Sequence, residues 1–361
     1  MKWKIWLNIL TIAALGIIIF VAWQDITEAF GRMRDLNLVI LLLFIPAQFF
    51  VFFGLAKLFY HFFRATENGT RVSLRTLFPA MLELNFVNHV FPSGGVSGFS
   101  YLTLRLKAEG VSTAKSTLAH LARFAFTFIG YIGLLLVALL VLAIEGRTSS
   151  LVVLAVSAIT FTILFGTGIL VFVIGDKDRI AVFTKGLAKA VNKIIHIFRR
   201  KHPETIRLNK VEKTFLELHE DYCLMRTNFG KMRQVLVWAM IVNVAEIVLL
   251  YLVFVAHGVW INPGAVIVAF VIANTAGLIA VLPGGIGVYE PLMTAVLISG
   301  GVPAGLALSA TLVYRVLALL LSLVTGYFLY QKVIHRADFI AAAEGKSSPI
   351  ARRIQRSARG S

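Results

Sequence analysis

Several uninterrupted apolar runs of roughly 20 residues or more constrain this chain more than any motif does. A run of that length, folded as an α-helix, crosses a bilayer core of about 30 Å. The 361-residue chain is 58% hydrophobic and 15% charged, whereas soluble domains carry about 25% charged residues. The runs are apolar on all sides, and a transmembrane β-barrel needs alternating apolar and polar positions. The sequence therefore predicts an all-α polytopic membrane protein.

The apolar runs predict about six spanning helices, with ends placed to within a few residues. The first run has no small-residue cleavage site before the polar stretch that follows Trp23, so we expect an uncleaved span and no removed signal peptide. The predicted spans are residues 5–23, 36–60, 116–144, 150–174, 234–256 and 304–331.

Two further apolar stretches are interrupted by Pro and Gly. Residues 76–111 centre on FPSGGVSG, and residues 264–302 centre on LPGGIGVYEP. Each has two apolar halves, and the shorter halves reach only part-way through a bilayer at about 1.5 Å per residue. They predict two re-entrant helical hairpins. The alternative for each, one kinked span plus an interfacial helix, stays open.

The net charge of +17 lies mainly in connections and in the tail. Residues 175–233 hold 14 Lys or Arg against 7 Asp or Glu, and residues 332–361 hold 7 against 2. This distribution favours anionic lipid headgroups, not nucleic acid, as the partners of the basic segments. The positive-inside rule places both termini in the cytoplasm of a cell-membrane protein, with the first hairpin entering from the cytoplasm and the second from outside.

An offset of 191 residues relates the two interrupted stretches. It pairs Pro92 with Pro283, Gly94 with Gly285 and Gly110-Val111 with Gly301-Val302, among nine identities in the 32 positions 90–121. Three predicted spans lie between the hairpins, so the second copy is expected upside down, as in the inverted repeats of secondary transporters. The alternative is that Pro and Gly only kink packed helices.

We expect a single membrane domain over residues 1–361, with repeats at 36–144 and 234–331, a basic cytoplasmic loop at 175–233 and a basic tail at 332–361.

The C-terminal segment LPGGIGVYEPLMTAVLISGGVPAGLALSATLVYRVLALLLSLVTGY resembles a known family. It is similar to the signature of the lysylphosphatidylglycerol synthase transmembrane-region family, which comprises flippase-like integral membrane proteins. The matching residues are Pro283, Gly284, Gly285, Gly287, Tyr289, Glu290, Gly301, Val302, Pro303, Tyr314 and Arg315. The stretch FPSGGVSGFSYLTLRLKAEGVS resembles the family's earlier motif, and the resemblance spans nearly the whole chain.

Two departures from the family pattern bear on function. Many members carry Arg and Glu in the first motif, where this chain has the uncharged residues 93–98. Bifunctional members add a soluble aminoacyl transferase domain, and no such domain is expected here. The resemblance therefore implies lipid translocation and not lipid synthesis.

Ionisable or strongly polar residues at membrane depth are functional candidates, because each costs about 2.5–3.5 kcal/mol to insert when charged. Arg suits the phosphate of a headgroup because its planar guanidinium can donate two parallel hydrogen bonds to it. A helix that starts after a Pro-Gly break directs its first N–H groups toward an anion. The predicted substrate-binding residues are Asn85, Asn88, Arg123, Glu246, Asn274, Glu290 and Arg315, together with Pro92, Gly94, Gly95, Pro283, Gly284, Gly285 and Gly287 at the breaks.

Several roles stay open at this point. Arg315 could form an internal ion pair with Glu290 or Glu246, or bind a phosphate, and Arg123 could extend to the cytoplasmic interface. Glu290 could cap its helix, neutralise Arg315, or hold a proton or a cationic headgroup. His89 and His120 show no second ligand at metal spacing, so we expect no metal, no cofactor and no catalytic residue.

The sequence predicts a lipid flippase or transporter. It would move a phospholipid, aminoacyl-lipid or polyprenyl-linked lipid between leaflets, with the headgroup bound near the midplane between the two hairpins. A membrane-embedded lipid-modifying enzyme and a non-transporting partner protein are the alternatives, and a homo-oligomer is left open.

Overall fold

Helices make up most of the residues that the computed structural model describes, and those residues contain no strand. It describes residues 20, 23–33, 36–66, 72–91, 96–146, 150–176, 178–180, 182–183, 186, 219, 222–223, 229–277, 287–336 and 339. The helices are α2 (Trp23–Met33), α3 (Leu38–Leu42), α4 (Phe44–Ala65), α5 (Leu74–Val90), α6 (Val96–Ala108), α7 (Thr113–Ile144), α8 (Ser150–Ile174), the short 3-10 helix η1 (Phe229–Met232), α11 (Arg233–Ala256), α12 (Pro263–Gly277), α13 (Tyr289–Ser299) and α14 (Ala304–Ile334).

Five of the predicted spans are confirmed as long apolar helices. They are α3 with α4 over Leu38–Ala65, α7, most of α8, η1 with α11, and α14. The predicted first span, residues 5–23, lies almost wholly outside the described residues. Large apolar side chains of α8 are widely exposed, among them Leu154 at 66% and Phe161 at 67%. Such a surface is stable next to hydrocarbon and not next to water, so the all-α polytopic membrane class is confirmed.

Polar caps fix where several helices begin. The side chain of Asn37 accepts hydrogen bonds from the N–H groups of Val39 and Ile40 before α3. Ser73 accepts from Thr76 N–H at the start of α5, and Ser112 accepts from Lys115 N–H at the start of α7. Each cap satisfies N–H groups that have no partner inside the helix.

Four shorter helices occupy the two interrupted stretches. Helices α5, α6, α12 and α13 have 17, 13, 15 and 11 residues, or roughly 26, 20, 22 and 16 Å at 1.5 Å per residue. None of these helices alone matches a bilayer core of about 30 Å. Helix α12 is buried on nearly all sides from Gly264 to Ala273, so other helices surround it.

The helix bounds repeat with the offset of 191 residues. Adding 191 to Ala65, Ala108 and Thr113 gives 256, 299 and 304, which are the last residues of α11 and α13 and the first residue of α14. Helices α4–α7 and α11–α14 therefore have the same order and nearly the same lengths.

The turn after the second short helix is also the same in both halves. Gly110 has φ 90° and Gly301 has φ 88°, values that a residue without Cβ adopts readily. The N–H of Val111 donates to Leu106 O at 3.0 Å, and the N–H of Val302 donates to Leu297 O at 3.0 Å. Both are Schellman turns with a buried Val after the Gly, so the identical Gly-Val pairs have the same backbone geometry in both halves.

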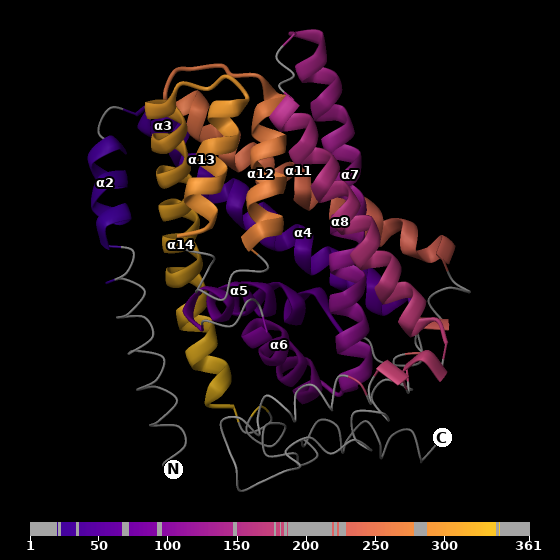
Figure 1. The fold of residues 1–361 in the computed structure, drawn as a ribbon. Coiled ribbons are helices and arrows are strands. Elements are labelled where there is room, and N and C mark those ends of the chain that lie inside the picture. The colour runs from indigo at the N-terminus through magenta and orange to yellow at the C-terminus, as the bar shows by residue number, and fades with distance from the viewer. Residues whose placement is uncertain are drawn as a thin grey trace, which may run out of the picture.

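The two halves pack across each other (Figure 1). Helix α5 packs on α14, and its counterpart α12 packs on α7, while α4 and α11 pack together. In Figure 1, α12 and α13 lie in the upper half and α5 and α6 in the lower half. Close contacts hold these crossings: a Cβ on Gly326 of α14 would lie 2.3 Å from Phe86 Cβ of α5.

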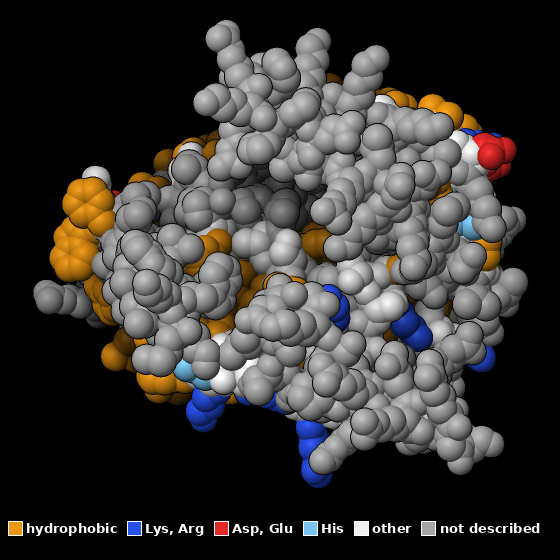
Figure 2. Space-filling model, turned by 90° about the horizontal axis from the view of Figure 1, so that it is seen from below, with side chains coloured by type: hydrophobic (Ala, Val, Ile, Leu, Met, Phe, Trp, Pro, Cys, Tyr) orange, Lys and Arg blue, Asp and Glu red, His pale blue; other side chains and the backbone are white. Residues whose placement is uncertain are grey.

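The charge at the two ends of the molecule differs. The lower face in Figure 2 shows several Lys and Arg side chains in blue, and the acidic side chains in view gather at one edge. Three exposed or half-buried basic residues lie at the ends of two helices: Lys107 in the last turn of α6, Lys332 in the last turn of α14, and Arg336 just after α14. Between His257 and Arg315 the described residues contain no Lys or Arg. In the described part of the chain, positive charge therefore gathers at the ends of α6 and α14, and we call this the basic end of the molecule.

The polar stretch after Trp23 forms a helix that the sequence reasoning treated as a connection. Helix α2 packs against α14, and its Arg32 donates to Glu28 Oε1 at 2.6 Å one turn earlier. The apolar and polar residues of WQDITEAFGRM separate onto two faces. This amphipathic pattern was the signal that could have predicted α2.

Candidate functional site

An ion pair at the start of α13 joins two predicted site residues. Arg315 Nε of α14 lies 2.9 Å from Glu290 Oε1, and both side chains are largely buried. The other carboxylate oxygen, Glu290 Oε2, accepts the N–H of Gly287 at 2.8 Å. Gly287 has φ 84°, which a residue with a Cβ rarely adopts. Of the two pairings left open for Arg315, the structure has the one with Glu290.

Tyr289 connects this ion pair with α12. The guanidinium carbon of Arg315 lies 4.3 Å from the centroid of the Tyr289 ring, a cation–π distance. Asn274 Nδ2 donates to the Tyr289 hydroxyl at 3.1 Å and to Phe270 O at 2.9 Å. Asn274, Glu290 and Arg315 are thus brought together around one tyrosine, and Gly287 is tied to the same carboxylate.

Arg123 of α7 and Glu246 of α11 form a second pair of opposite charges. Each acts electrostatically on the other. In the described part of the chain, however, neither makes a hydrogen bond or an ion pair within 4.0 Å. Both side chains are half-buried. Arg123 is ten positions after the first residue of the 32-residue α7, about 15 Å along that helix.

Three tyrosines link the two pairs of charges. Tyr131, Tyr289 and Tyr314 are each within electrostatic range of Glu246, and all three are buried. Tyr289 and Tyr314 also act electrostatically on Arg315 and on each other. We call these residues, Arg123, Tyr131, Glu246, Tyr289, Glu290, Tyr314 and Arg315, the interior charge cluster. It draws on both sequence repeats.

The first hairpin contains a charged network that the sequence reasoning missed. The Tyr101 hydroxyl donates to Glu83 Oε2 at 2.8 Å, and Arg105 Nε lies 3.4 Å from the same oxygen. Arg105 also pairs with Glu109 at 2.6 Å. Arg105 is not among the predicted site residues, but its side chain is buried against Glu83.

The offset of 191 residues relates this network to the second hairpin. It places Glu83 on Asn274, and each of these polar side chains bonds to a tyrosine hydroxyl of the following short helix, Tyr101 or Tyr289. The tyrosines themselves are not at equivalent positions. Glu83 in the first half and Asn274 in the second half therefore both bond their own helix to the next short helix through a tyrosine hydroxyl. Because one is an acid and the other an amide, a search for identical residues does not detect this correspondence.

The remaining predicted residues of α5 contact their own hairpin. The Asn88 side chain lies against Gly98, where a Cβ would be 2.0 Å from Asn88 Oδ1. Asn85 O contacts His89 Nδ1 at 2.8 Å, and His89 in turn acts electrostatically on Arg315. His120 is enclosed by the rings of Phe59 and Phe99. The predicted residues Pro92, Gly94, Gly95, Pro283, Gly284 and Gly285 lie outside the described residues.

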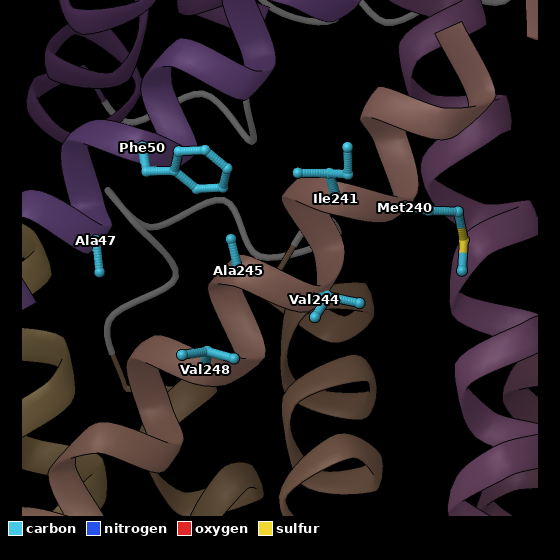
Figure 3. A pocket seen from close by; sticks show the side chains of 7 residues that line it. All are labelled: Ala47, Phe50, Met240, Ile241, Val244, Ala245 and Val248. Atoms are coloured by element: carbon cyan, nitrogen blue, oxygen red, sulfur yellow. The ribbon is translucent and has the colours of Figure 1, made fainter. Parts of the chain in front are cut away.

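An apolar groove runs beside the interior charge cluster, between α4 and α11 (Figure 3). Its volume is about 440 Å³, and its lining side chains are Ala47, Phe50, Met240, Ile241, Val244, Ala245 and Val248. Phe50 and Val248 are 46% and 45% exposed. Ala245 faces the groove in Figure 3, and the next residue along α11, Glu246, belongs to the interior charge cluster.

Comparisons with known proteins agree with this architecture. The family model described as lysylphosphatidylglycerol synthase TM region matches residues 5–326. A UPF0104 membrane protein of Methanothermobacter thermautotrophicus is 33% identical over 134 residues, 34% of this chain and 40% of that relative. Another match to a UPF0104 membrane protein of that organism is 28% identical over 256 residues, covering 68% of this chain and 72% of the relative.

A UPF0104 membrane protein of Pyrococcus horikoshii is 24% identical over 188 residues, 50% of this chain and 53% of the relative. No solved structure matches the chain. The family model covers far more than half of the chain, and the helices place its signature residues Tyr289, Glu290, Tyr314 and Arg315 in one cluster. The chain therefore belongs to the lysylphosphatidylglycerol synthase TM-region family.

Proposed function

We propose that this chain moves a phospholipid, aminoacyl-lipid or polyprenyl-linked lipid between the leaflets of the cell membrane, as a transporter without an enzymatic step. The observation that carries the proposal is the interior charge cluster. Two arginines, Arg123 and Arg315, come from corresponding helices of the two repeats, α7 and α14. Charged groups inside a membrane protein are costly, and where they occur they often mark a substrate or ion pathway. Guanidinium groups bind phosphate well.

The proposed architecture is an inverted repeat of two re-entrant hairpins, α5–α6 and α12–α13. The constant offset in the helix bounds and the exchanged packing, α5 on α14 and α12 on α7, support it. Three long helices, α7, α8 and α11, separate the hairpins, and an odd number of crossings reverses the second copy. Such repeats bind their substrates near the midplane.

The basic end is proposed to face the cytoplasm, with both chain termini on that side. Positive charge gathers at the ends of α6 and α14, and the sequence places 14 Lys or Arg in residues 175–233. Anionic headgroups of the inner leaflet are the expected partners of these segments.

The lipid would cross with its headgroup inside the protein and its tails outside. The groove between α4 and α11 is lined only by apolar side chains, which suits acyl chains. A second apolar groove of about 370 Å³ lies between α3–α4 and α14. Both grooves lie beside helices of the interior charge cluster. A headgroup at the arginines would therefore keep its tails in a hydrocarbon environment.

Leaflet exchange in liposomes tests the proposal. Purified protein is reconstituted with lipids that carry a fluorescent label, and an impermeant reductant bleaches the outer leaflet. Wild type is expected to expose inner-leaflet label to bleaching, and Arg315→Ala is expected to slow that exchange at least tenfold. The matched control is Arg64→Ala at the exposed end of α4, which should exchange lipid like wild type. Equal rates for Arg315→Ala and wild type would contradict the role of Arg315.

A further inference from the structure

Lys57 of α4 is a cation placed among three aromatic rings. Its ammonium nitrogen, Nζ, lies 5.4 Å from the centroid of the Phe53 ring and 5.9 Å from those of Tyr60 and Trp238, which are cation–π distances. The rings of Phe53 and Trp238 meet edge to face, with centroids 6.0 Å apart. Lys57 is half-buried. The rings therefore fix the position of one positive charge where α4 meets α11.

No carboxylate of the described residues lies within 4.0 Å of Lys57, and the ion pairs found there join other side chains. Helix α4 contains no Asp or Glu, and the acidic residue of α11 is Glu246, eight positions after Trp238, about 12 Å along that helix. Aromatic faces attract a cation but do not neutralise it, and a charge partly removed from water is costly without an anion. The surroundings of Lys57 thus suit an anion supplied by a ligand.

The apolar groove between α4 and α11 leads to this cation. Phe50 of the groove lining is seven positions before Lys57, so two helical turns put both side chains on one face of α4. On α11, Ile241 of the lining is three positions after Trp238, and these two side chains also share a face. The groove volume of about 440 Å³ is in the range of about 300–1,000 Å³ of small-ligand pockets. One outer surface of the bundle therefore has an apolar groove with a cation about 10 Å beyond Phe50 along α4.

Positive charge continues past Lys57 at this end of the groove. Trp238 is five positions after Arg233, the first residue of α11, and both Arg233 and the nearby Lys231 are exposed. An anionic phospholipid has its groups in the matching order, with apolar chains next to a phosphate at the membrane surface. An ammonium donates up to three hydrogen bonds to phosphate oxygens. A lipid that also carries a quaternary ammonium brings a second cation, which this positive end repels.

We propose that Lys57 and the groove between α4 and α11 form a binding site for one anionic phospholipid, with its phosphate at the Lys57 ammonium and an acyl chain along the groove. This site is separate from the interior charge cluster, because its cation is on α4 among the rings of Phe53, Tyr60 and Trp238. Its ligand comes from the surrounding membrane and binds at the outer surface of the bundle. Binding there does not require that the protein moves lipid between leaflets.

Native mass spectrometry of the full-length protein in detergent micelles tests the site. The probes are equal amounts of dioleoyl phosphatidylglycerol and dioleoyl phosphatidylcholine, and wild type is expected to retain one phosphatidylglycerol in preference. Lys57→Ala should lower that retention about tenfold, as expected for the loss of one charge-assisted hydrogen bond. Lys57→Arg keeps the cation and should retain the lipid. Arg75→Ala, exposed at the start of α5, removes the same charge elsewhere and should behave like wild type.

Ala245→Phe tests the position of the acyl chain. Ala245 faces the groove in Figure 3, so a ring there would take the place of the chain and weaken retention. Its matched control is Val237→Phe, 41% exposed on α11 and outside the groove lining. If Lys57→Ala does not fold, Lys57→Gln replaces it, because it keeps part of the apolar stem.

Equal retention of phosphatidylglycerol by wild type and the uncharged Lys57 variant would overturn the proposal. Equal retention of both lipids by wild type, or of phosphatidylglycerol by Ala245→Phe and wild type, would also overturn it. None of these outcomes measures leaflet exchange, so the proposed function keeps its own separate test.

Discussion

At the scale of single residues, a charged side chain in the membrane interior is costly, so the partner that it pairs with determines whether it is stable there. Glu290 uses one carboxylate oxygen for Arg315 and the other for the N–H of Gly287, which are the two kinds of donor that a phosphate would use. Under the proposed function, the Glu290 carboxylate would occupy the place that the phosphate of a substrate takes. Among the described residues, Arg123 has no carboxylate within 4.0 Å, so the proposed function makes it the arginine most available to a headgroup.

The Glu290–Arg315 pair predicts a measurable coupling energy. Removing one partner of a buried ion pair costs about 3–5 kcal/mol, and less where solvent reaches the pair. We expect Glu290→Gln and Arg315→Gln each to lower the unfolding temperature in detergent. The double variant should lose less than the sum of the two single losses, with a coupling of about 1–3 kcal/mol. Additive losses would show that the pair contributes no energy of its own.

At the scale of helices, close backbone contacts set the crossings between the two repeats. Gly326 of α14 lies so near α5 that a Cβ would meet Phe86 Cβ at 2.3 Å and the backbone oxygen of Leu82 at 2.7 Å. Backbone cannot move aside as a flexible side chain can. This crossing holds the first hairpin on the last helix, next to the charged network of Glu83, Tyr101 and Arg105.

Replacing Gly326 by Ala should therefore destabilise the protein. Overpacking at such a contact costs about 1–3 kcal/mol, and we expect a lower unfolding temperature in detergent. Gly305→Ala on the same helix is the matched control, since nothing lies within 4 Å of a Cβ there. The control should be neutral or slightly stabilising, because Ala favours a helix over Gly by about 0.5–1 kcal/mol. Equal effects of the two substitutions would contradict the close crossing.

The helices could be predicted well from the sequence because their signal is local. Apolar runs and Pro-Gly breaks gave the bounds of α7, α8, α11 and α14 to within a few residues, since burial in hydrocarbon requires continuous apolar length. The partner of Glu83 could not be predicted in this way. Tyr101 and Arg105 are 18 and 22 positions further on, and only the packing of α6 on α5 brings them to that carboxylate.

At the scale of the whole molecule, the proposed inversion predicts that equivalent residues face opposite sides of the membrane. Thr113 and Ala304 are the first residues of α7 and α14, are both exposed, and are related by the offset of 191. In a Cys223→Ser background, an impermeant maleimide applied to intact cells should label Ala304→Cys and not Thr113→Cys. Permeabilised cells should label both. Labelling of both positions from outside would contradict the inverted repeat.

The most direct test of lipid translocation is the rate of leaflet exchange when both arginines of the interior charge cluster are replaced. Wild type, the double variant Arg123→Gln with Arg315→Gln, and the control Arg64→Ala are compared in the same liposomes with a set of labelled phosphate-bearing lipids. We predict that wild type and the control exchange at least one of these lipids at equal rates, and that the double variant falls to the rate of protein-free liposomes. A double variant that is folded and exchanges lipid as fast as wild type would contradict a headgroup path through Arg123 and Arg315.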